Sequence, residues 1–499
     1  MEEYTILELQ EKMESGELSA RTIAELYLER ISSIDNGGPS INAVIELNPD
    51  ALEIADKLDA ERASNQIRGP LHGIPVMLKD NFDTADKMMT TAGSLALEGN
   101  YASQDSFAAQ KLREAGAVII GKTNLSEWAN FRSTRSTSGW SSRGGQTRNP
   151  YALDRNPCGS SSGSAVAVAA NLCAAALGTE TDGSLVCPAH SNGIVSIKPT
   201  LGLISRSGII PVSHSQDTAG PMTRTVTDTA VLLGTLIGFD PRDPVTENGQ
   251  GKALADYTTC LDRDGLRGVR IGVARNFFGF NPDVDKIMET CIAEMKRLGA
   301  EIIDPANVGS KEALGKVEVE VLLHNFKANL NKYLGGVSPD LPAHSLKEII
   351  AFNEKNSDVV MPYFGQERML LAEEKGPLTD PEYIKALETN HRLARTEGID
   401  ATLIEHKLDA IVAPTGGPAW FTDWVNGDHF GGSSSSFPAA AGYPNITVPA
   451  GYIHGLPVGI SFFGGAFQEP TLIKLAYAFE QATQIRRPPQ FLPGVDFGA

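Results

Sequence analysis

Cysteine is scarce in this 499-residue chain, and no CxxC pair occurs. The five cysteines are Cys158, Cys173, Cys187, Cys260 and Cys291. An odd number without Cys/His clusters at metal-ligand spacing argues against a disulfide framework and against a zinc site. Cys158 and Cys187 flank two serine-rich motifs, and we interpret them as packing residues rather than reactive thiols. We expect no metal and no cofactor.

Long hydrophobic runs are also missing. No stretch approaches the roughly 20 apolar residues of a membrane helix. The first eight residues, MEEYTILE, have neither the basic segment nor the apolar segment of a secretory signal. We therefore expect a cytoplasmic protein that does not contact a membrane.

Basic residues are in the minority, with 43 Lys and Arg against 61 Asp and Glu and a net charge of −18. Binding to a phosphate backbone needs clustered Lys and Arg, so we expect no nucleic-acid partner. The charge favours solubility and says little about a small-molecule substrate. We expect a monomer or a homodimer, between which the sequence does not decide.

The length allows about three average domains or one large α/β domain with insertions. Helical spacing of apolar residues occurs in residues 4–34 and 51–63 and again near 225–238, 284–298 and 470–483. Short apolar, strand-like runs lie at residues 74–78, 117–120, 195–199, 270–274, 408–414, 444–449 and 456–463. This alternation predicts an α/β sheet with both faces covered by helices.

Residues 310–400 differ from the rest of the chain. They are charged, have mostly helical spacing and lack the serine and glycine motifs found elsewhere. We interpret them as a helical insertion that shapes substrate access.

Two serine clusters make residues 158–184 the most distinctive segment. CGSSSGS (158–164) and GTETDGS (178–184) bracket an Ala/Val-rich run, residues 165–177, which has the propensity of one buried helix. Ser162 or Ser164 would cap this helix, whose free N–H groups would face the serine loop. The pattern indicates two hydroxyls brought together with backbone N–H groups around them.

A serine nucleophile needs a neighbouring base, which is most often histidine. Gly159–Gly163 formally matches G-x-S-x-G with Ser161 at its centre. A nucleophile elbow, however, follows a buried strand, and the preceding Thr147–Pro157 cannot form a central strand. One of the nine histidines could still approach Ser161, so this α/β-hydrolase interpretation stays a less favoured alternative.

Lysine is the other candidate base. An unperturbed lysine, with a pKa of about 10.4, is charged at neutral pH, and burial lowers that pKa. Lys79 ends an apolar run; the neighbouring Asp80 would point to the opposite face of a strand. A solvated residue at a strand end is the simpler interpretation of Lys79. Lys122 and Lys198 also follow apolar strands, and the pattern does not choose among the three.

The tight polar turn Thr181–Ser184 is a candidate oxyanion site. Consecutive backbone N–H groups in such a turn can converge on a developing oxyanion, which is worth roughly 3–4 kcal/mol per donor in the transition state. An ordinary β-turn is the alternative interpretation.

Together these motifs resemble the amidase signature family. The resemblance rests on residues 73–81, 121–129, 159–165, 178–184, 198–200, 442–449 and 455–460, and it spans about residues 5–240 and 400–485. It implies one large α/β domain, residues 1–499, with a central mixed, twisted sheet covered by helices on both faces.

The resemblance also implies the catalytic roles. Lys79 is then the base, Ser160 the bridging serine at a cis peptide bond, and Ser184 the nucleophile that carries the acyl group. The oxyanion hole would consist of the backbone N–H groups of Thr181, Asp182, Gly183 and Ser184. The leaving amine would receive its proton along the same relay.

Two positions depart from the commonest family pattern, because Asp182 and Ser162 stand where glycine is frequent. The sequence TETDGS at residues 179–184, together with the upstream segment Gly139–Pro150, is most similar to the peptide amidase branch of the family. Enzymes of that branch hydrolyse C-terminal carboxamides of peptides to acid and ammonia. We expect Trp128 and Asn130 to line the substrate pocket.

Two other functions remain as alternatives. The first is an amidotransferase subunit that supplies ammonia to a partner acting on charged tRNA, since such subunits share the triad. Asp182 and the upstream segment argue against it. The second is a non-catalytic binding protein on the same scaffold, against which the intact triad positions argue.

Overall fold

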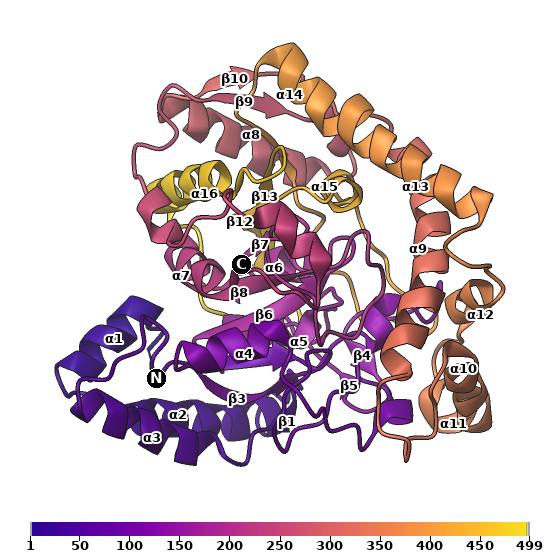
Figure 1. Cartoon of the computed structure of the whole chain (residues 1–499). Coiled ribbons are helices and arrows are strands. Elements are labelled where there is room, and N and C mark those ends of the chain that lie inside the picture. The colour runs from indigo at the N-terminus through magenta and orange to yellow at the C-terminus, as the bar shows by residue number, and fades with distance from the viewer. Residues whose placement is uncertain (1, 496, 498–499) are drawn as a thin grey trace.

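A computed structural model describes residues 2–495 and 497. In this part of the chain, eleven strands form one mixed sheet in the order β1-β3-β2-β6-β8-β7-β12-β13-β11-β9-β10 (Figure 1). Their bounds are β1 Val44–Leu47, β2 Pro75–Lys79, β3 Val118–Thr123, β6 Ala175–Glu180, β7 Val195–Lys198, β8 Thr218–Thr223, β9 Arg270–Val273, β10 Glu301–Ile303, β11 Ala410–Pro414, β12 Asn445–Ile453 and β13 Leu456–Phe463. A separate short pair joins β4 (Trp140–Ser141) to β5 (Gly145–Gln146).

Helices cover both faces of this sheet, so the predicted α/β class with a mixed central sheet is confirmed. Their bounds are α1 Ile6–Glu14, α2 Ala20–Arg30, α3 Ala51–Ala63, α4 Phe107–Glu114, α5 Ser162–Ala169, α6 Val186–Ser191, α7 Val226–Leu236, α8 Pro282–Arg297, α9 Lys311–Leu334, α10 Leu346–Lys355, α11 Ser357–Val360, α12 Glu367–Glu373, α13 Pro381–Ala394, α14 Asp400–His406, α15 Ser436–Ala441 and α16 Glu469–Thr483. Each of the helical and strand-like runs predicted above overlaps a corresponding helix or strand.

Four central strands, β2, β3, β6 and β8, position the serine clusters. Strand β2 runs parallel to both β3 and β6, with Leu78 opposite Lys122 and Leu177. Strand β6 pairs antiparallel with β8, where Gly178 lies opposite Gly220. All residues of these strands are buried, which explains their nearly continuous apolar sequences.

The prediction of one helix across residues 165–177 is wrong. Helix α5 ends at Ala169, and Ala175 already belongs to β6. In the sheet, Ala175–Leu177 pair with Val76–Leu78 of β2, and this pairing overrides the helix propensity of alanine.

The serine caps predicted for this helix are also wrong. Ser162 Oγ donates to the carbonyl of Cys158 at 2.6 Å, and Ser164 Oγ donates to the carbonyl of Leu177 at 2.9 Å. Both hydroxyls therefore tie α5 to neighbouring segments instead of satisfying its first N–H groups.

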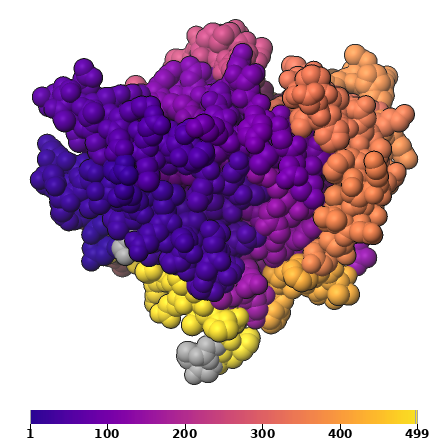
Figure 2. Space-filling model, turned by 90° about the horizontal axis from the view of Figure 1, so that it is seen from below, coloured from indigo at the N-terminus to yellow at the C-terminus, as the bar shows by residue number. Residues whose placement is uncertain are grey.

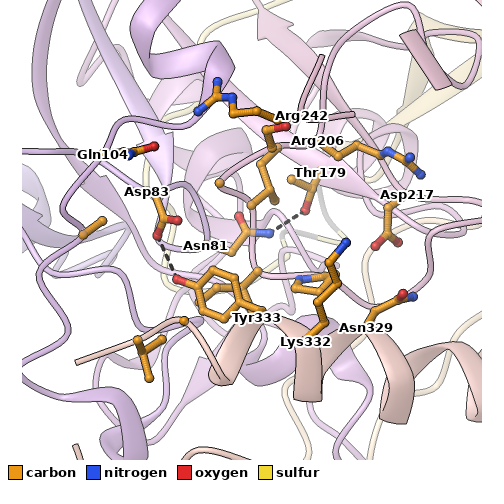
Figure 3. Close-up of a pocket in the computed structure, with 18 of the residues that line it drawn as sticks. Asn81, Asp83, Gln104, Thr179, Arg206, Asp217, Arg242, Asn329, Lys332 and Tyr333 are labelled. Atoms are coloured by element: carbon orange, nitrogen blue, oxygen red, sulfur yellow. Dashed lines mark hydrogen bonds between the residues drawn. The ribbon is translucent and has the colours of Figure 1, made fainter. Parts of the chain in front are cut away.

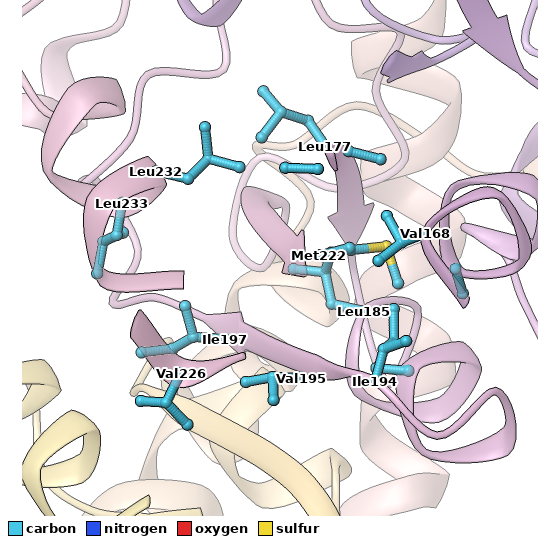
Figure 4. Close-up of a cluster of buried hydrophobic side chains, with 14 of the residues drawn as sticks. Val168, Leu177, Leu185, Ile194, Val195, Ile197, Met222, Val226, Leu232 and Leu233 are labelled. Carbon is cyan, nitrogen blue, oxygen red and sulfur yellow. The ribbon is translucent and has the colours of Figure 1, made fainter. Parts of the chain in front are cut away.

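The main hydrophobic core lies between the sheet and its helices (Figure 4). Leu177, Ile197 and Met222 come from β6, β7 and β8, and all three are fully buried. Leu232 and Leu233 of α7 approach them from one side in the view. This packing holds the strand ends on which the polar residues of the serine clusters sit.

Residues 310–400 are mostly helical, as expected, and form an arc along one side of the molecule (Figure 1). Buried Leu322, Phe326 and Leu330 of α9 pack in a second hydrophobic cluster. Arg132 ties this region to the rest, because its guanidinium donates to the carbonyl of Val360 at 2.6 Å. That this region is an insertion within the domain stays a prediction.

The first and last described segments meet on one face of the molecule, where Figure 2 shows the N-terminal indigo residues beside the yellow C-terminal ones. An ion pair between Glu3 and Arg486 joins them. Over residues 2–495 and 497, we find no helix with the length and apolar character to cross a membrane.

Replacing Leu233 by alanine tests the packing of α7. Because Leu233 is fully buried, the change removes apolar contacts and leaves a cavity, which costs about 2–5 kcal/mol. We expect a lower midpoint of urea-induced unfolding. Leu371→Ala is the matched control, since this leucine is 46% exposed and its loss costs about 0.5 kcal/mol or less. Equal midpoints for the two variants would contradict the packing described.

Candidate active site

Lys79 ends β2 and is completely buried. Its Nζ donates to Ser160 Oγ and to Thr179 Oγ1, both at 2.8 Å, and to Ser161 Oγ at 3.2 Å. Strand pairing explains this arrangement, because β6 carries Thr179 alongside β2 and leads directly into the second serine cluster.

Asp80 points away from the amino group of Lys79, as the alternation along a strand predicts. Its carboxylate accepts hydrogen bonds from Thr91 Oγ1 and from the N–H of Gly93, and it lies 3.4 Å from the guanidinium of Arg143. Lys79 therefore has hydroxyl groups, rather than this carboxylate, as its hydrogen-bond partners.

The lack of a carboxylate partner changes the protonation of Lys79. Burial lowers the pKa of Lys79 to about 7, and the charges of Asp217 and Glu180 raise it only in part. A large fraction of the amine is therefore neutral near pH 7, the state in which a lysine can accept a proton.

The other two lysines lie elsewhere. Lys122 Nζ donates to Thr90 Oγ1 and to two backbone carbonyls, and Lys198 Nζ donates to the carbonyl of Pro199. Within the described residues, Lys79 therefore differs from Lys122 and Lys198, because its amino group forms hydrogen bonds with serines of the first cluster.

Thr179 and Ser161 orient the amine of Lys79. Ser161 Oγ donates its proton to the carbonyl of Thr179 at 3.0 Å, so it can only accept from Lys79. Thr179 Oγ1 also accepts from Asn81 Nδ2 at 3.1 Å. A neutral amine has two N–H donors and one lone pair. When Lys79 loses its proton, two N–H donors remain for Ser161 and Thr179, and the lone pair takes the place of the N–H that was donated to Ser160 Oγ.

Thr179 and Asn81 were missed by the sequence analysis. Asn81 stands two residues after Lys79, and Thr179 lies within the second serine cluster. Both residues lie within motifs that the sequence singles out, but the spacing of these motifs does not show that β2 and β6 are neighbouring strands.

Ser160 is fully buried, and the peptide bond Gly159–Ser160 is cis, as the family resemblance implies. The neighbouring N–H of Ser161 donates to the carbonyl of Ser184 at 3.3 Å, which brings the two serine clusters together. No hydrogen bond joins the hydroxyls of Ser160 and Ser184 within residues 2–495 and 497.

The turn Thr181–Ser184 presents open backbone donors. In the described part of the chain, the N–H groups of Asp182, Gly183 and Ser184 donate to no protein acceptor. Gly183 has a φ of +81°, which glycine adopts without strain, and Ser184 is 8% exposed. These N–H groups are free to bind an oxyanion beside the Ser184 hydroxyl.

Glu180 holds the residues that follow the turn. Its Oε2 accepts from the N–H of Leu185 at 2.8 Å and from that of Val186 at 3.1 Å, at the start of α6. These two amides are thereby satisfied, whereas those of the turn remain open.

Cys158 and Cys187 form a disulfide with Cα atoms 6.1 Å apart, so the expectation of unpaired packing residues is wrong. Counting cysteines missed it because the fold brings one pair together and leaves Cys173, Cys260 and Cys291 free. The bond joins the loop before Ser160 to the first turn of α6, after Ser184. Cytosolic thiols are normally kept reduced, so this bond does not favour the cytoplasmic location, which stays a prediction.

A cavity of about 750 Å³ opens beside this site (Figure 3). Asn81 and Thr179 lie at its wall, and Lys332 and Tyr333 of α9 face them. Residues of the 310–400 region thus contribute to this cavity. Trp128 and Asn130 do not line it; the Trp128 ring packs in the second hydrophobic cluster instead.

A family model described as Amidase matches residues 22–473. The chain belongs to the amidase family and is a hydrolase that acts on carbon–nitrogen amide bonds.

Three similar proteins span nearly the whole chain. The solved structure of the native peptide amidase from Stenotrophomonas maltophilia is 51% identical, covers 98% of this chain and 99% of its own, and superposes with a TM-score of 0.93. A probable amidase from Arabidopsis thaliana is 42% identical over 99% of this chain and 92% of its own length. A glutamyl-tRNA(Gln) amidotransferase subunit from Thermoanaerobacter pseudethanolicus is 35% identical over 98% of both chains.

The disulfide predicts a thiol count. Under denaturing conditions, alkylation without reductant is expected to label the three free cysteines, and alkylation after reduction is expected to label all five. Mass spectrometry of the intact chain distinguishes the two. Five labels without reductant would show that the bond does not form.

The double variant Cys158→Ser/Cys187→Ser tests the contribution of the bond to stability. Because the two residues are 29 positions apart, loss of the link increases the entropy of the unfolded chain by an amount worth about 3–4 kcal/mol. We expect a lower unfolding midpoint. Cys260→Ser, which changes a free cysteine, is the control.

Proposed function

We propose that this amidase hydrolyses the C-terminal carboxamide of peptides to a carboxylic acid and ammonia, through an acyl-enzyme on Ser184. One observation carries the proposal: buried Lys79 Nζ lies 2.8 Å from Ser160 Oγ, and the cluster that contains Ser160 is held against Ser184. The similarity to the peptide amidase of S. maltophilia supports the substrate class.

Acylation needs a proton to leave Ser184. In the proposed mechanism, Ser184 Oγ attacks the carboxamide carbon and gives its proton to Ser160, while Ser160 gives its own proton to neutral Lys79. Catalytic hydrogen bonds are often formed only when substrate binds, so their absence between the two serines here is compatible with this relay.

The oxygen of the tetrahedral intermediate would lie against the backbone N–H groups of the turn, whose residues are Thr181, Asp182, Gly183 and Ser184. Donors that are already oriented stabilise the developing charge without reorganising. Because three of these N–H groups have no partner within the described part of the chain, their donor capacity is available.

Collapse of the intermediate breaks the C–N bond. The leaving nitrogen takes a proton from Ser160, which recovers one from Lys79, and ammonia departs. A water molecule then attacks the acyl-enzyme, and its proton moves along the same path to Lys79. When the ester bond breaks, Ser184 regains its proton, and the carboxylic acid leaves.

An amidotransferase subunit remains the second candidate, because one such subunit is 35% identical along almost the whole chain. The two functions differ in their substrate and in their need for a partner. Ammonia release should be measured from peptide amides, fatty amides and glutamine with the isolated protein. The measurement should be repeated after tRNA-binding subunits are added. Release of ammonia from glutamine but not from the other amides, and only when those subunits are present, would favour the amidotransferase.

Ser184→Ala is expected to abolish ammonia release from peptide amides by at least about 10³-fold, because the nucleophile is lost. Circular dichroism checks that the fold persists. Labelling of the wild-type protein with a serine-directed fluorophosphonate should modify Ser184. Labelling of Ser161 would instead support the α/β-hydrolase alternative, and near-wild-type turnover by soluble Ser184→Ala would rule out the proposed mechanism.

The pH dependence tests Lys79 as the base. Since neutral lysine is required, kcat/KM should fall about tenfold per pH unit below about 7 and level off above it, following the lowered pKa of Lys79. Lys79→Arg should be inactive, because a guanidinium keeps its proton in this range. A profile that rises only near the ordinary lysine value of 10.5 would contradict the assignment.

A further inference from the structure

The side chain of Asp182, the residue that replaces a frequent glycine, contacts a distant segment. Ser435 Oγ donates to Asp182 Oδ1 at 2.5 Å, and Ser436 Oγ donates to Oδ2 at 2.8 Å. The two serines follow Asp182 by 253 and 254 residues. In the described part of the chain, these two hydroxyls are the hydrogen-bond donors to the Asp182 carboxylate.

The serine segment is itself well supported. Ser433 Oγ and Ser435 Oγ are 2.8 Å apart, and the N–H of Ser435 donates to Ser433 Oγ at 3.1 Å. Helix α15 begins at Ser436, and its next residue, Phe437, is fully buried in a hydrophobic cluster. The hydroxyls that reach Asp182 are therefore fixed by local hydrogen bonds and by core packing.

A second contact joins the same two segments. A Cβ atom added to Gly183 would lie 3.0 Å from Ser435 Oγ, so the backbone of Gly183 packs closely against that side chain. Two successive residues of the turn, Asp182 and Gly183, thus rest on Ser435. Their peptide groups cannot rotate freely while this contact persists.

We propose that Ser435 and Ser436 are positioning residues that act through Asp182 to hold the Thr181–Ser184 turn in the orientation that receives the oxyanion. This inference rests on the proposed role of Ser184. We name the set Asp182, Ser435 and Ser436 the carboxylate latch.

The latch matters because oxyanion donors must be placed accurately. Donors displaced by about 0.5 Å lose part of their stabilising effect, and a misplacement of about 1 Å can cost about 100-fold in rate. The turn itself supplies no hydrogen-bond donor to the Asp182 carboxylate among the described residues. The two hydroxyls fix its carboxylate and, through it, the orientation of the peptide group between Asp182 and Gly183.

A test on the serines is cleaner than one on the acid. Glu318 of α9 is buried, and burial together with the charge of Asp182 raises the pKa of Glu318 well above its ordinary value. Gln216 Nε2 donates both to Glu318 Oε1 at 2.8 Å and to the carbonyl of Thr181 at 3.2 Å. Removing the charge of Asp182 would therefore also lower the pKa of Glu318, whereas removing a serine hydroxyl leaves both acids in place.

The experiment measures kcat and KM with a peptide amide for the Ser435→Ala/Ser436→Ala double variant. We expect kcat to fall about 10- to 100-fold, with KM changed less than about threefold, because the turn loses its orientation more than the substrate loses contacts. Ser434→Ala is the matched control. Ser434 is fully buried, and its hydroxyl has no hydrogen-bond partner among the described residues, so this variant should retain wild-type kcat.

A double-mutant cycle separates the latch from a general structural effect. Asp182→Ala alone and Asp182→Ala combined with both serine changes should have equal kcat. Once the carboxylate is gone, the two hydroxyls have no acceptor at this position, so their removal has no further effect. Ser436→Thr, which keeps the hydroxyl on a half-buried residue, should restore most of the kcat lost in Ser436→Ala. Unfolding midpoints of all variants check that the folded state persists.

The outcomes distinguish this inference from the proposed function. If Ser184→Ala is inactive and the double serine variant keeps wild-type kcat, the latch is wrong and the proposed function stands. Additive losses in the cycle, or a change confined to KM, would also overturn the latch. An active Ser184→Ala would overturn both.

Discussion

The burial of one amino group is the constraint on which this site depends. Water is excluded from Lys79, and the resulting loss of solvation lowers the pKa of Lys79 to about 7. A carboxylate within hydrogen-bond distance would restore the charged state. Instead, the amine forms hydrogen bonds with the uncharged hydroxyl groups of Ser160, Ser161 and Thr179. These groups carry no negative charge that would raise the pKa of Lys79 again.

The central sheet makes this burial possible. Parallel β2 and β6 place Lys79 beside Thr179, and the alternation along β2 sends Asp80 to the other side. Helix α5 follows the first serine cluster, and α6 follows the second, so both clusters are attached to packed elements. The loops therefore hold polar groups in a defined geometry.

Long-range ties then bring these loops into register. The disulfide joins Cys158 of the first cluster covalently to Cys187 in the first turn of α6, just after the second cluster. The hydroxyls of Ser435 and Ser436 connect the second cluster to the start of α15. The disulfide joins residues on either side of the proposed reacting serines, and the hydroxyls of Ser435 and Ser436 hold the turn that leads to Ser184.

The order of residues along the chain was enough to predict the α/β class, most element positions and, through the motifs around Lys79, Ser160 and Ser184, the family. Those features depend on local periodicity and on short motifs, which a single chain displays. The folded chain was needed to show that residues 175–177 are strand, that Lys79 rather than Lys122 or Lys198 meets a serine, and that Cys158 pairs with Cys187. The contact of Asp182 with Ser435 and Ser436 is also a feature that only the folded chain shows. These outcomes depend on contacts between distant segments, and the chemistry of a buried group is set by neighbours that residue order does not reveal.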